Sequence, residues 1–223
     1  MARDRYAVFV AGGSGTRMGS DIPKQFLLLE GKPILQRSIE AFVEAVPDLK
    51  IIVVLSRTCI AYWKELCLAY SFDVPHLFVS GGLTRFHSVR NALEKVPDGA
   101  LVAIHDGVRP LISPDLVRTL FEKGETCPAV IPVIPVTDTL RYRNPALGDA
   151  DREALVAVQT PQIFHSEALK AAYNQAYETA FTDDGSVVRK YGIPLTLEEG
   201  ERFNIKITTP EDLVLASAIL SSR

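Results

Sequence analysis

The chain has 223 residues, a length that fits one α/β domain burying about three quarters of its unfolded surface. Charged residues make up 23% and hydrophobic residues 47%, which excludes a disordered or collagen-like chain. The net charge of -3 disfavours a general nucleic-acid binder, because such proteins need a surplus of Lys and Arg. We therefore expect a compact fold without a nucleic-acid partner.

The apolar stretch Tyr6–Ala11 is too short for a signal-peptide core or a membrane span. We expect a cytosolic protein that has no membrane partner. The cysteines Cys59, Cys67 and Cys127 have spacings that fit neither a zinc site nor a disulfide framework, and we interpret them as core thiols.

Short apolar runs alternate along the chain with longer segments of helical period. The runs are Tyr6–Ala11, Ile51–Ser56, His76–Val79, Leu101–His105 and Ala129–Val136. The helical segments are about Pro33–Val46, Cys59–Tyr70, Phe86–Lys95 and Pro114–Lys123. This alternation predicts an α/β fold in which helices cover both faces of a mostly parallel sheet.

Two helix starts are clear in the sequence. Ser113-Pro114 and Thr209-Pro210 each place an N-cap hydroxyl before a proline, with acid in the first turn. Thr182, followed by two aspartates, is interpreted as a further N-cap rather than as part of a metal site.

The stretch Thr137–Val158 breaks the alternation, because it is polar and contains few successive apolar residues. It is too long for a plain connection inside a compact domain. We therefore predict one domain, 1–223, with a functional excursion or a disordered loop at about 137–158.

A glycine-rich turn follows the first apolar run and reads Ala11-Gly12-Gly13-Ser14-Gly15, with Arg17 and Lys24 close behind. Glycines allow close approach of a ligand and present backbone N–H groups to an anion. A dinucleotide fingerprint fits poorly, because its third glycine is one residue late, and a P-loop lacks its Gly-Lys-Ser/Thr ending. Phosphate binding is favoured over an ordinary turn, although Arg17 and Lys24 alone could be solvated surface cations.

A second cluster, His105–Pro110, stands at the end of the fourth apolar run. Ligands of open α/β sheets bind beyond the carboxyl ends of the strands, so Asp106 and Arg109 are expected to face the same crevice as the glycine turn. Asp106 could bind Mg²⁺ that bridges phosphates, or it could be a turn-capping acid. His105 is interpreted as structural. Gly82 and Ser88 stand where a base or ribose could lie against exposed backbone.

These motifs together resemble the 2-C-methyl-D-erythritol 4-phosphate cytidylyltransferase family, and they follow the family order along the whole chain. They are Ala11–Met18, Pro23-Lys24-Gln25, Gly81-Gly82 with Ser88, His105–Pro110, Thr160-Pro161-Gln162, Thr182-Asp183-Asp184 and Asn204-Ile205-Lys206. The resemblance implies a Rossmann-like nucleotidyltransferase fold with a mostly parallel twisted sheet and a protruding arm. The implied reaction is CTP plus methylerythritol phosphate giving CDP-methylerythritol and pyrophosphate, a step of non-mevalonate isoprenoid biosynthesis.

The resemblance also implies roles for individual residues. Arg17, Lys24 and Lys206 match cations that bind phosphate and stabilise the transition state. The nucleotide-binding positions are Ala11, Gly12, Gly13, Ser14, Gly15, Gly82, Ser88 and Asp106, of which Ala11, Gly12, Gly82 and Ser88 match positions that contact the cytidine. Asp106, Arg109 and Thr160 match acceptor-side positions, with Asp106 near the metal. Thr139 and Arg152 would complete the acceptor site of a second subunit, so the resemblance implies a homodimer.

Three departures from the family pattern stand out: Gly107 and Gly185 replace a commoner alanine, and Leu83 stands where an acid is frequent. The ribitol 5-phosphate cytidylyltransferases share most of these motifs, so ribitol phosphate remains an alternative acceptor. A nucleotide-binding module without chemistry is a further alternative. A dehydrogenase would need an acid at the end of the second strand, where the chain has Leu55-Ser56-Arg57.

Overall fold

The computed structural model describes residues 3–13 and 22–222. Its strands are β1 (Arg5–Val10), β2 (Leu28–Leu29), β3 (Lys32–Pro33), β4 (Lys50–Leu55), β5 (His76–Ser80), β6 (Leu101–Asp106), β7 (Ala129–Pro135), β8 (Val156–Val158), β9 (Gln162–His165) and β10 (Thr196–Glu199). Its helices are α1 (Ile34–Ala45), α2 (Arg57–Ala69), α3 (Arg85–Leu93), α4 (Pro114–Gly124), α5 (Ser166–Tyr173), α6 (Asp184–Lys190) and α7 (Pro210–Ser221), with short 3-10 turns at Lys24–Phe26, Pro145–Leu147 and Arg152–Ala154. The five predicted strands and four predicted helices are confirmed, with ends within two residues of the prediction.

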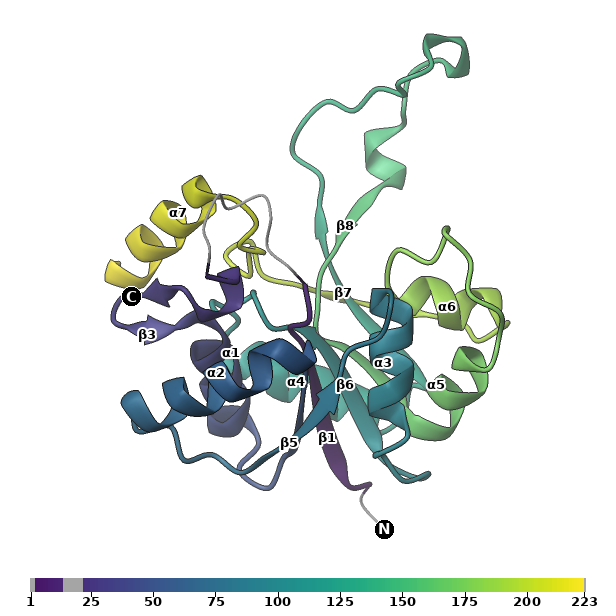
Figure 1. The fold of residues 1–223 in the computed structure, drawn as a ribbon. Helices are drawn as coiled ribbons and strands as arrows, with labels where there is room; N and C mark the ends of the chain where they lie inside the picture. Colours follow the sequence, from purple (N-terminus) through teal and green to yellow (C-terminus); the bar gives the residue numbers. More distant parts are fainter. Residues whose placement is uncertain (1–2, 14–21, 223) are drawn as a thin grey trace.

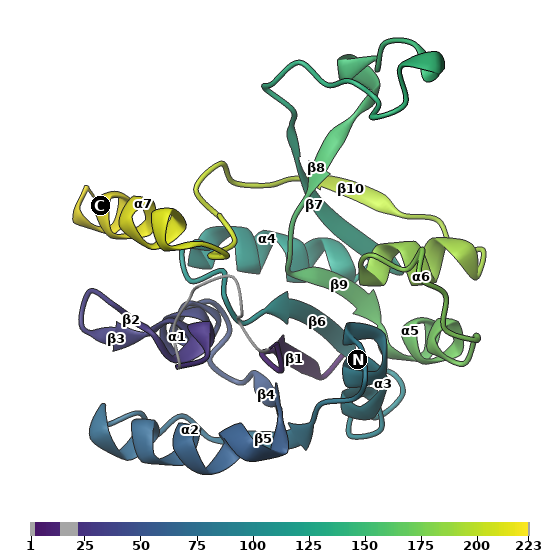
Figure 2. The same ribbon diagram turned by 45° about the horizontal axis from the view of Figure 1, so that its top comes forward.

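The main sheet has the strand order β10-β7-β9-β6-β1-β4-β5, and helices cover both of its faces (Figures 1 and 2). Strand β1 pairs in parallel with β4 and β6, and β4 pairs in parallel with β5. Strand β9 runs antiparallel to both β6 and β7. The predicted, mostly parallel α/β architecture is therefore confirmed.

Side chains of successive strand residues point to opposite faces and enter two separate cores. In β1, Ala7 and Phe9 pack in the core under α1, α2 and α4, whereas Val8 packs in the core under α3, α5 and α6. Both faces are apolar because both are covered, which explains why the parallel strands read as continuous hydrophobic runs.

The carboxyl ends of β1, β4, β5 and β6 lie at one edge of the sheet, since these strands are mutually parallel. Strand β9 runs the other way and begins at this edge, with Gln162 opposite Ile104. The turns after Val10, Ser80 and Asp106 and the residues just before Gln162 are therefore brought together. This edge is the place where ligands bind in open α/β sheets.

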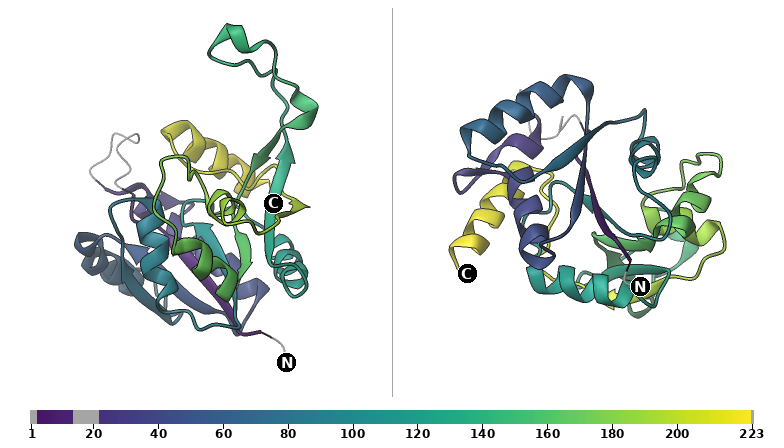
Figure 3. Two further views of the ribbon diagram at one scale, coloured as in Figure 1. Left: turned by 90° about the vertical axis from the view of Figure 1, so that its right-hand side faces the viewer. Right: turned by 90° about the horizontal axis from the view of Figure 1, so that it is seen from below.

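A long arm projects from the body of the molecule between β7 and β8, as Figures 1 and 3 show. Its base is an antiparallel pair in which Val133 lies opposite Val158. Farther out, Arg141 and Asp149 form an isolated bridge and an ion pair. The polar stretch singled out in the sequence lies in this arm and its returning strand.

Two local predictions need correction. Asp183, not Thr182, is the N-cap of α6, because its carboxylate accepts the Ser186 N–H at 2.9 Å. The cysteines are free but only partly buried, and they pack against the edge of the core rather than inside it. Even so, burial raises the pKa of the Cys67 thiol to about 11.

Within residues 3–13 and 22–222, no helix has the length and apolarity needed to cross a bilayer.

Thr209 is the N-cap of α7, as predicted, and Asp212 in the first turn stabilises this helix start. The Asp212 carboxylate accepts the N–H groups of Thr208 at 2.7 Å and Thr209 at 2.9 Å. We expect Asp212→Ala to lower the free energy of unfolding by about 1–2 kcal/mol, because the helix start loses these acceptors. Urea denaturation measures the change.

The matched control is Glu211→Ala, which removes an exposed acid from the same turn and the same favourable interaction with the helix dipole. If both variants lose equal stability, the bonds of Asp212 to the N–H groups of Thr208 and Thr209 contribute nothing beyond what another acid of this turn contributes.

Candidate active site

Two adjoining pockets open at the carboxyl edge of the sheet. The glycine-side pocket, of about 470 Å³, lies against the turn after β1 and the start of α3. The threonine-side pocket, of about 290 Å³, lies against the start of β9 and the segment before α6. Arg85, Asp106 and Lys206 line both pockets and so form the wall between them.

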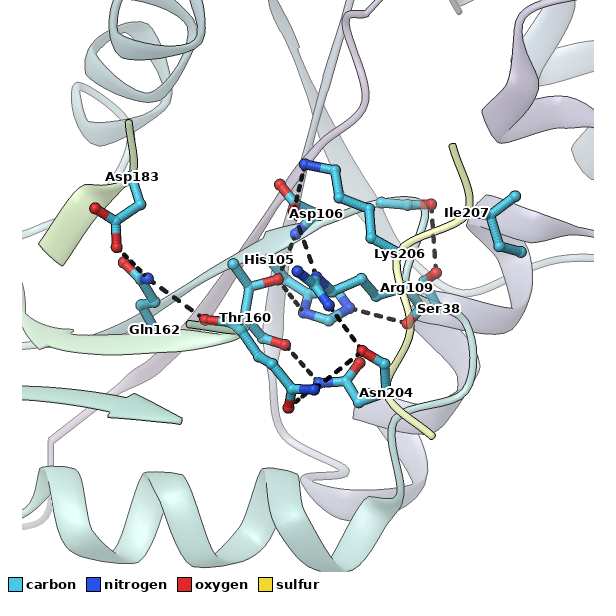
Figure 4. Close-up of polar contacts among 12 residues, drawn as sticks. Ser38, His105, Asp106, Arg109, Thr160, Gln162, Asp183, Asn204, Lys206 and Ile207 are labelled. Atoms are coloured by element: carbon cyan, nitrogen blue, oxygen red, sulfur yellow. Dashed lines mark hydrogen bonds and ion pairs between the residues drawn. The ribbon is translucent and has the colours of Figure 1, made fainter. Parts of the chain in front are cut away.

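The Asp106 carboxylate is the centre of this wall. Its Oδ2 lies 2.9 Å from Lys206 Nζ and 3.4 Å from Arg109 Nε. Its Oδ1 lies 3.7 Å from Arg85 Nε. Figure 4 shows Lys206 and Arg109 converging on Asp106 from the two chain segments that carry them. Three cations from distant parts of the sequence thus meet at one acid.

These charges keep Asp106 ionised. Burial alone would raise the pKa of its carboxyl, but the positive charges of Arg85, Lys206 and Arg109 outweigh that effect and hold the pKa well below its usual range. Burial lowers the pKa of Arg109 against the attraction of Asp106, yet a guanidinium stays protonated in proteins. The wall between the pockets therefore carries fixed charges.

Lys24 reaches this edge from the 3-10 turn Lys24–Phe26. Its Nζ donates to the carbonyl of Ile207 at 3.0 Å, which ties the turn to the segment that carries Lys206. The neighbouring Gln25 donates to the carbonyl of Ala11 at 2.7 Å and so holds the start of the glycine-rich turn. Lys24 and Lys206 both line the glycine-side pocket, so a single anionic ligand can contact both.

The glycine-rich turn is open towards the pocket. A Cβ on Gly13 would meet no described atom within 4 Å, so packing inside the protein does not require glycine there. At Gly82 the opposite holds, because a Cβ would lie 2.4 Å from His87 Cβ. The Gly82 N–H donates to Ser88 Oγ at 3.0 Å, and Ser88 in turn donates to the carbonyl of Thr84. Ser88 therefore shapes this side of the pocket through its bonds to the loop.

Thr160 and His105 support Asp106 from below through a chain of hydrogen bonds. The Asp106 N–H donates to Thr160 Oγ1 at 3.0 Å, and that hydroxyl lies 3.2 Å from His105 Nδ1. His105 Nε2 lies 3.2 Å from the carbonyl of Arg109. All four groups are satisfied when His105 is neutral, with Nδ1 accepting and Nε2 donating. Burial lowers the pKa of His105 to about 3, which keeps it neutral and agrees with a structural role.

A polar network holds the segment that carries Lys206. Gln159 Nε2 donates to the carbonyl of Glu201 at 2.8 Å, and Asn204 Nδ2 donates to the carbonyl of Thr160 at 2.9 Å. Glu201 accepts the N–H of Ser113 at the start of α4. Arg109 Nη1 donates to the carbonyl of Asn204 at 2.7 Å. The position of Lys206 is thus set by groups that line or underlie the threonine-side pocket.

The structure brings most of the predicted site residues to these two pockets. Ala11, Gly12, Gly13, Lys24, Gly82, Ser88, Asp106 and Lys206 line the glycine-side pocket, and Asp106, Arg109, Thr160 and Lys206 line the threonine-side pocket. Arg17, Ser14 and Gly15 lie outside the described residues. Thr139 and Arg152 lie on the arm and line neither pocket of their own chain.

The sequence interpretation missed Arg85, which lines both pockets. The available signal was its place at the first position of a helix, where a positive charge opposes the helix dipole and where this helix carries no acid. It assigned no site role to Gln159, Gln162 and Asp183, which line the threonine-side pocket, although Gln162 and Asp183 belong to motifs noted in the sequence. Gln162 Nε2 donates to Asp183 Oδ2 at 2.7 Å and so ties the start of β9 to the cap of α6.

An open, mostly parallel sheet with a glycine-rich turn after its first strand and two cationic pockets at its carboxyl edge defines a Rossmann-like nucleotidyltransferase. The model of the 2-C-methyl-D-erythritol 4-phosphate cytidylyltransferase family matches residues 6–222. The chain belongs to this family.

Individual relatives agree with this assignment. The cytidylyltransferase of Porphyromonas gingivalis is 51% identical over 100% of both chains, and that of Bacteroides thetaiotaomicron is 50% identical over 96% of this chain and 98% of its own. The structure of the Thermus thermophilus enzyme has a TM-score of 0.77 and 32% identity, covering 99% of this chain and 100% of its own. The 4-diphosphocytidyl-2C-methyl-D-erythritol synthase of Anaerococcus prevotii has a TM-score of 0.83 and 26% identity, covering 98% of this chain and 96% of its own.

Neutral, buried His105 gives the fold a defined sensitivity to acid. The unfolded imidazole takes up a proton near its usual pKa of 6.5, whereas the folded protein resists protonation down to about pH 3. The free energy of unfolding therefore falls as the pH drops through this window. By pH 5 we expect His105 to account for a loss of about 2 kcal/mol. In the His105→Gln variant, the fall in the free energy of unfolding as the pH drops to 5 should be smaller by this amount.

Denaturant titrations at pH 7 and pH 5 give the change in stability for each variant. His87→Gln is the control, since it removes a more exposed histidine and keeps His105. Identical pH-dependence in wild type and His105→Gln would mean that His105 is not the buried neutral group described above.

Proposed function

We propose that the chain transfers CMP from CTP to 2-C-methyl-D-erythritol 4-phosphate and releases pyrophosphate. The observation that carries this proposal is the pair of adjoining pockets separated by one charged wall of Arg85, Asp106 and Lys206. The glycine-side pocket suits a nucleotide, with open backbone and Lys24 for the phosphates. The threonine-side pocket suits a small anionic acceptor beside Arg109 and Thr160.

The proposed chemistry is an in-line displacement at the α-phosphorus of CTP. A phosphate oxygen of the acceptor forms the new bond to phosphorus, and the bond to the bridging oxygen breaks, so that pyrophosphate leaves with the electron pair. The attacking phosphate is already ionised and needs no strong general base. This agrees with the site, where His105 is buried and neutral. Catalysis rests on positioning and on neutralising charge, for which Lys24, Lys206 and Arg17 are the proposed groups.

We propose that Mg²⁺ accompanies the triphosphate. The donor set suits this ion: among the described residues, Asp106 Oδ1 has a loose 3.7 Å contact with Arg85, and this oxygen can accept a further partner. One carboxylate together with phosphate oxygens is a ligand set that Mg²⁺ accepts. When bound, the ion would neutralise charge on the phosphates.

We further propose that the enzyme is a cytoplasmic homodimer in which the arm of one subunit reaches the acceptor pocket of the other. The arm extends away from its own body, and its residues Leu155, Val156 and Val158 are 40–45% exposed. Exposed apolar side chains on a projecting segment are suited to contact with a second chain. Thr139 and Arg152 would then act in the partner's site.

Pyrophosphate release tests the function. With CTP and Mg²⁺, we expect turnover with methylerythritol phosphate that exceeds turnover with ribitol 5-phosphate at least roughly tenfold. Lys24→Ala is the matched inactive control and should lose roughly a hundredfold or more in rate, because one cation at the phosphates is removed. Preference for ribitol phosphate would assign the other acceptor. No turnover with either acceptor would refute the transferase.

A mixing experiment tests whether a site is built from two subunits. Arg152→Ala and Lys24→Ala are each expected to be nearly inactive. If Arg152 acts in the partner's site, unfolding and refolding an equal mixture yields mixed dimers with one intact site, and about a quarter of the wild-type activity returns. If each site is built within one chain, the mixture stays as inactive as its components.

A further inference from the structure

Arg85 is a cation between the two pockets, and the electrostatics of its own helix do not favour it there. It is the first residue of α3, where a positive charge is unfavourable and where the helix has no compensating acid. Its side chain is 28% exposed and lines both pockets. The helix dipole alone would favour a neutral or acidic residue at this position, and the exposed part of the side chain lies at the pockets, so the position of Arg85 points to a ligand.

Two buried residues hold Arg85 from inside the protein. Arg85 Nη2 lies 2.6 Å from Asp184 Oδ2, and Asp184 is fully buried. Tyr173, on α5, donates its hydroxyl to the other oxygen of Asp184 at 2.5 Å. Burial raises the pKa of Tyr173 well above its usual value, so the hydroxyl keeps its proton. Three helices therefore contribute to placing one guanidinium at the wall between the pockets.

The orientation of Arg85 leaves part of its guanidinium available. Nη2 contacts Asp184 and Nε faces Asp106 Oδ1, while Nη1 makes no hydrogen bond to any described residue. Lys206 approaches the same carboxylate at Oδ2, and it too lines both pockets. Burial would lower the pKa of Arg85, but Asp184 and Asp106 outweigh it and raise the pKa, which keeps the charge permanent.

We infer that Arg85 binds the two reacting phosphoryl groups, the α-phosphate of the nucleotide and the phosphate of the acceptor, at the point where the two pockets meet. The inference rests on the proposed function. Two anions must come within bonding distance there, and a planar cation with a spare N–H group can bridge an oxygen of each. Asp184 and Tyr173 are positioning residues that act through Arg85.

Steady-state kinetics of Arg85 variants test this role. Because the charge is needed most when the phosphates meet, we expect Arg85→Gln to lower kcat roughly a hundredfold or more, with a smaller change in the KM for CTP. Asp184→Asn keeps the cation but loosens it, and we expect a loss of about tenfold in kcat. Arg90→Gln, an exposed arginine on the same helix, is the control and should keep full activity.

Arg85→Gln also leaves Asp184 buried without its partner, which itself destabilises the fold. The double variant Arg85→Gln/Asp184→Asn removes both charges and separates the two effects. If Arg85 is only structural, the double variant regains both stability and turnover. If Arg85 binds the phosphates, it regains stability while kcat stays roughly a hundredfold low.

Chemical rescue gives a second readout that a structural role would not move. In Arg85→Ala/Asp184→Asn, added ethylguanidinium should raise kcat roughly fivefold or more, and it should not do so in Lys24→Ala. Full activity of the double variant, or equal rescue of both, overturns the role of Arg85 while the proposed function stands. A wild-type enzyme without pyrophosphate release removes the proposed function and this inference with it.

Discussion

A single buried carboxylate, that of Asp106, organises the candidate active site. A buried charge is costly unless it is paired, and Asp106 is paired with cations from the start of α3, from the turn after β6 and from the segment before α7. Each of those segments must be in place for the charge to be tolerated. The charged wall, which lines both pockets, therefore depends on the correct placement of all three segments.

A polar chain beneath Asp106 supports this arrangement. Thr160 and His105 form hydrogen bonds that join β6 to the start of β9 and to the turn after β6. Because the imidazole of His105 is neutral, it satisfies its hydrogen-bonding neighbours without adding a charge. His105 also packs edge-on against Phe9 and lies beside Phe42, so its ring belongs to the apolar core. The site combines fixed charges above with a neutral support below. That combination suits a reaction that needs positioned cations and no proton-transfer base.

Most of the central fold could be predicted from the sequence, because parallel strands covered on both faces read as apolar runs with clear ends. The clustering of the glycine turn with Asp106 followed from the rule that parallel strands end at one edge. Strand β9 was missed because it has only four residues, Gln162–His165, and follows a polar segment. The contact between Lys206 and Asp106 joins residues about a hundred positions apart and has no local signature, so only the family resemblance pointed to it.

Arg85 and Asp183 show a second limit of what can be predicted from the sequence. The glycines before α3 favour an interpretation through backbone contacts, and a cation at the start of a helix is a weak signal beside the many charges on ordinary helix surfaces. At α6 the sequence offers a hydroxyl and two carboxylates as caps, and spacing alone does not decide among adjacent acceptors. In the structure Asp183 is the cap: its carboxylate accepts the Ser186 N–H, and its own N–H donates to Ser186 Oγ at 3.3 Å, which completes a reciprocal pair.

Gly107 and Gly185, where the family more commonly has alanine, affect packing near the charged wall and change none of its charges. A Cβ on Gly107 would lie 2.9 Å from Leu35 Cδ1 and 3.1 Å from Ala11 Cβ, so Leu35 occupies the space that an alanine would need. The Gly107 N–H still donates to the carbonyl of Val10 at 3.1 Å and joins the ends of β1 and β6. Gly185 likewise keeps its backbone bond, donating to Gln162 Oε1 at 2.8 Å. Both glycines thus contribute backbone hydrogen bonds, and neighbouring side chains occupy the space that a Cβ would need.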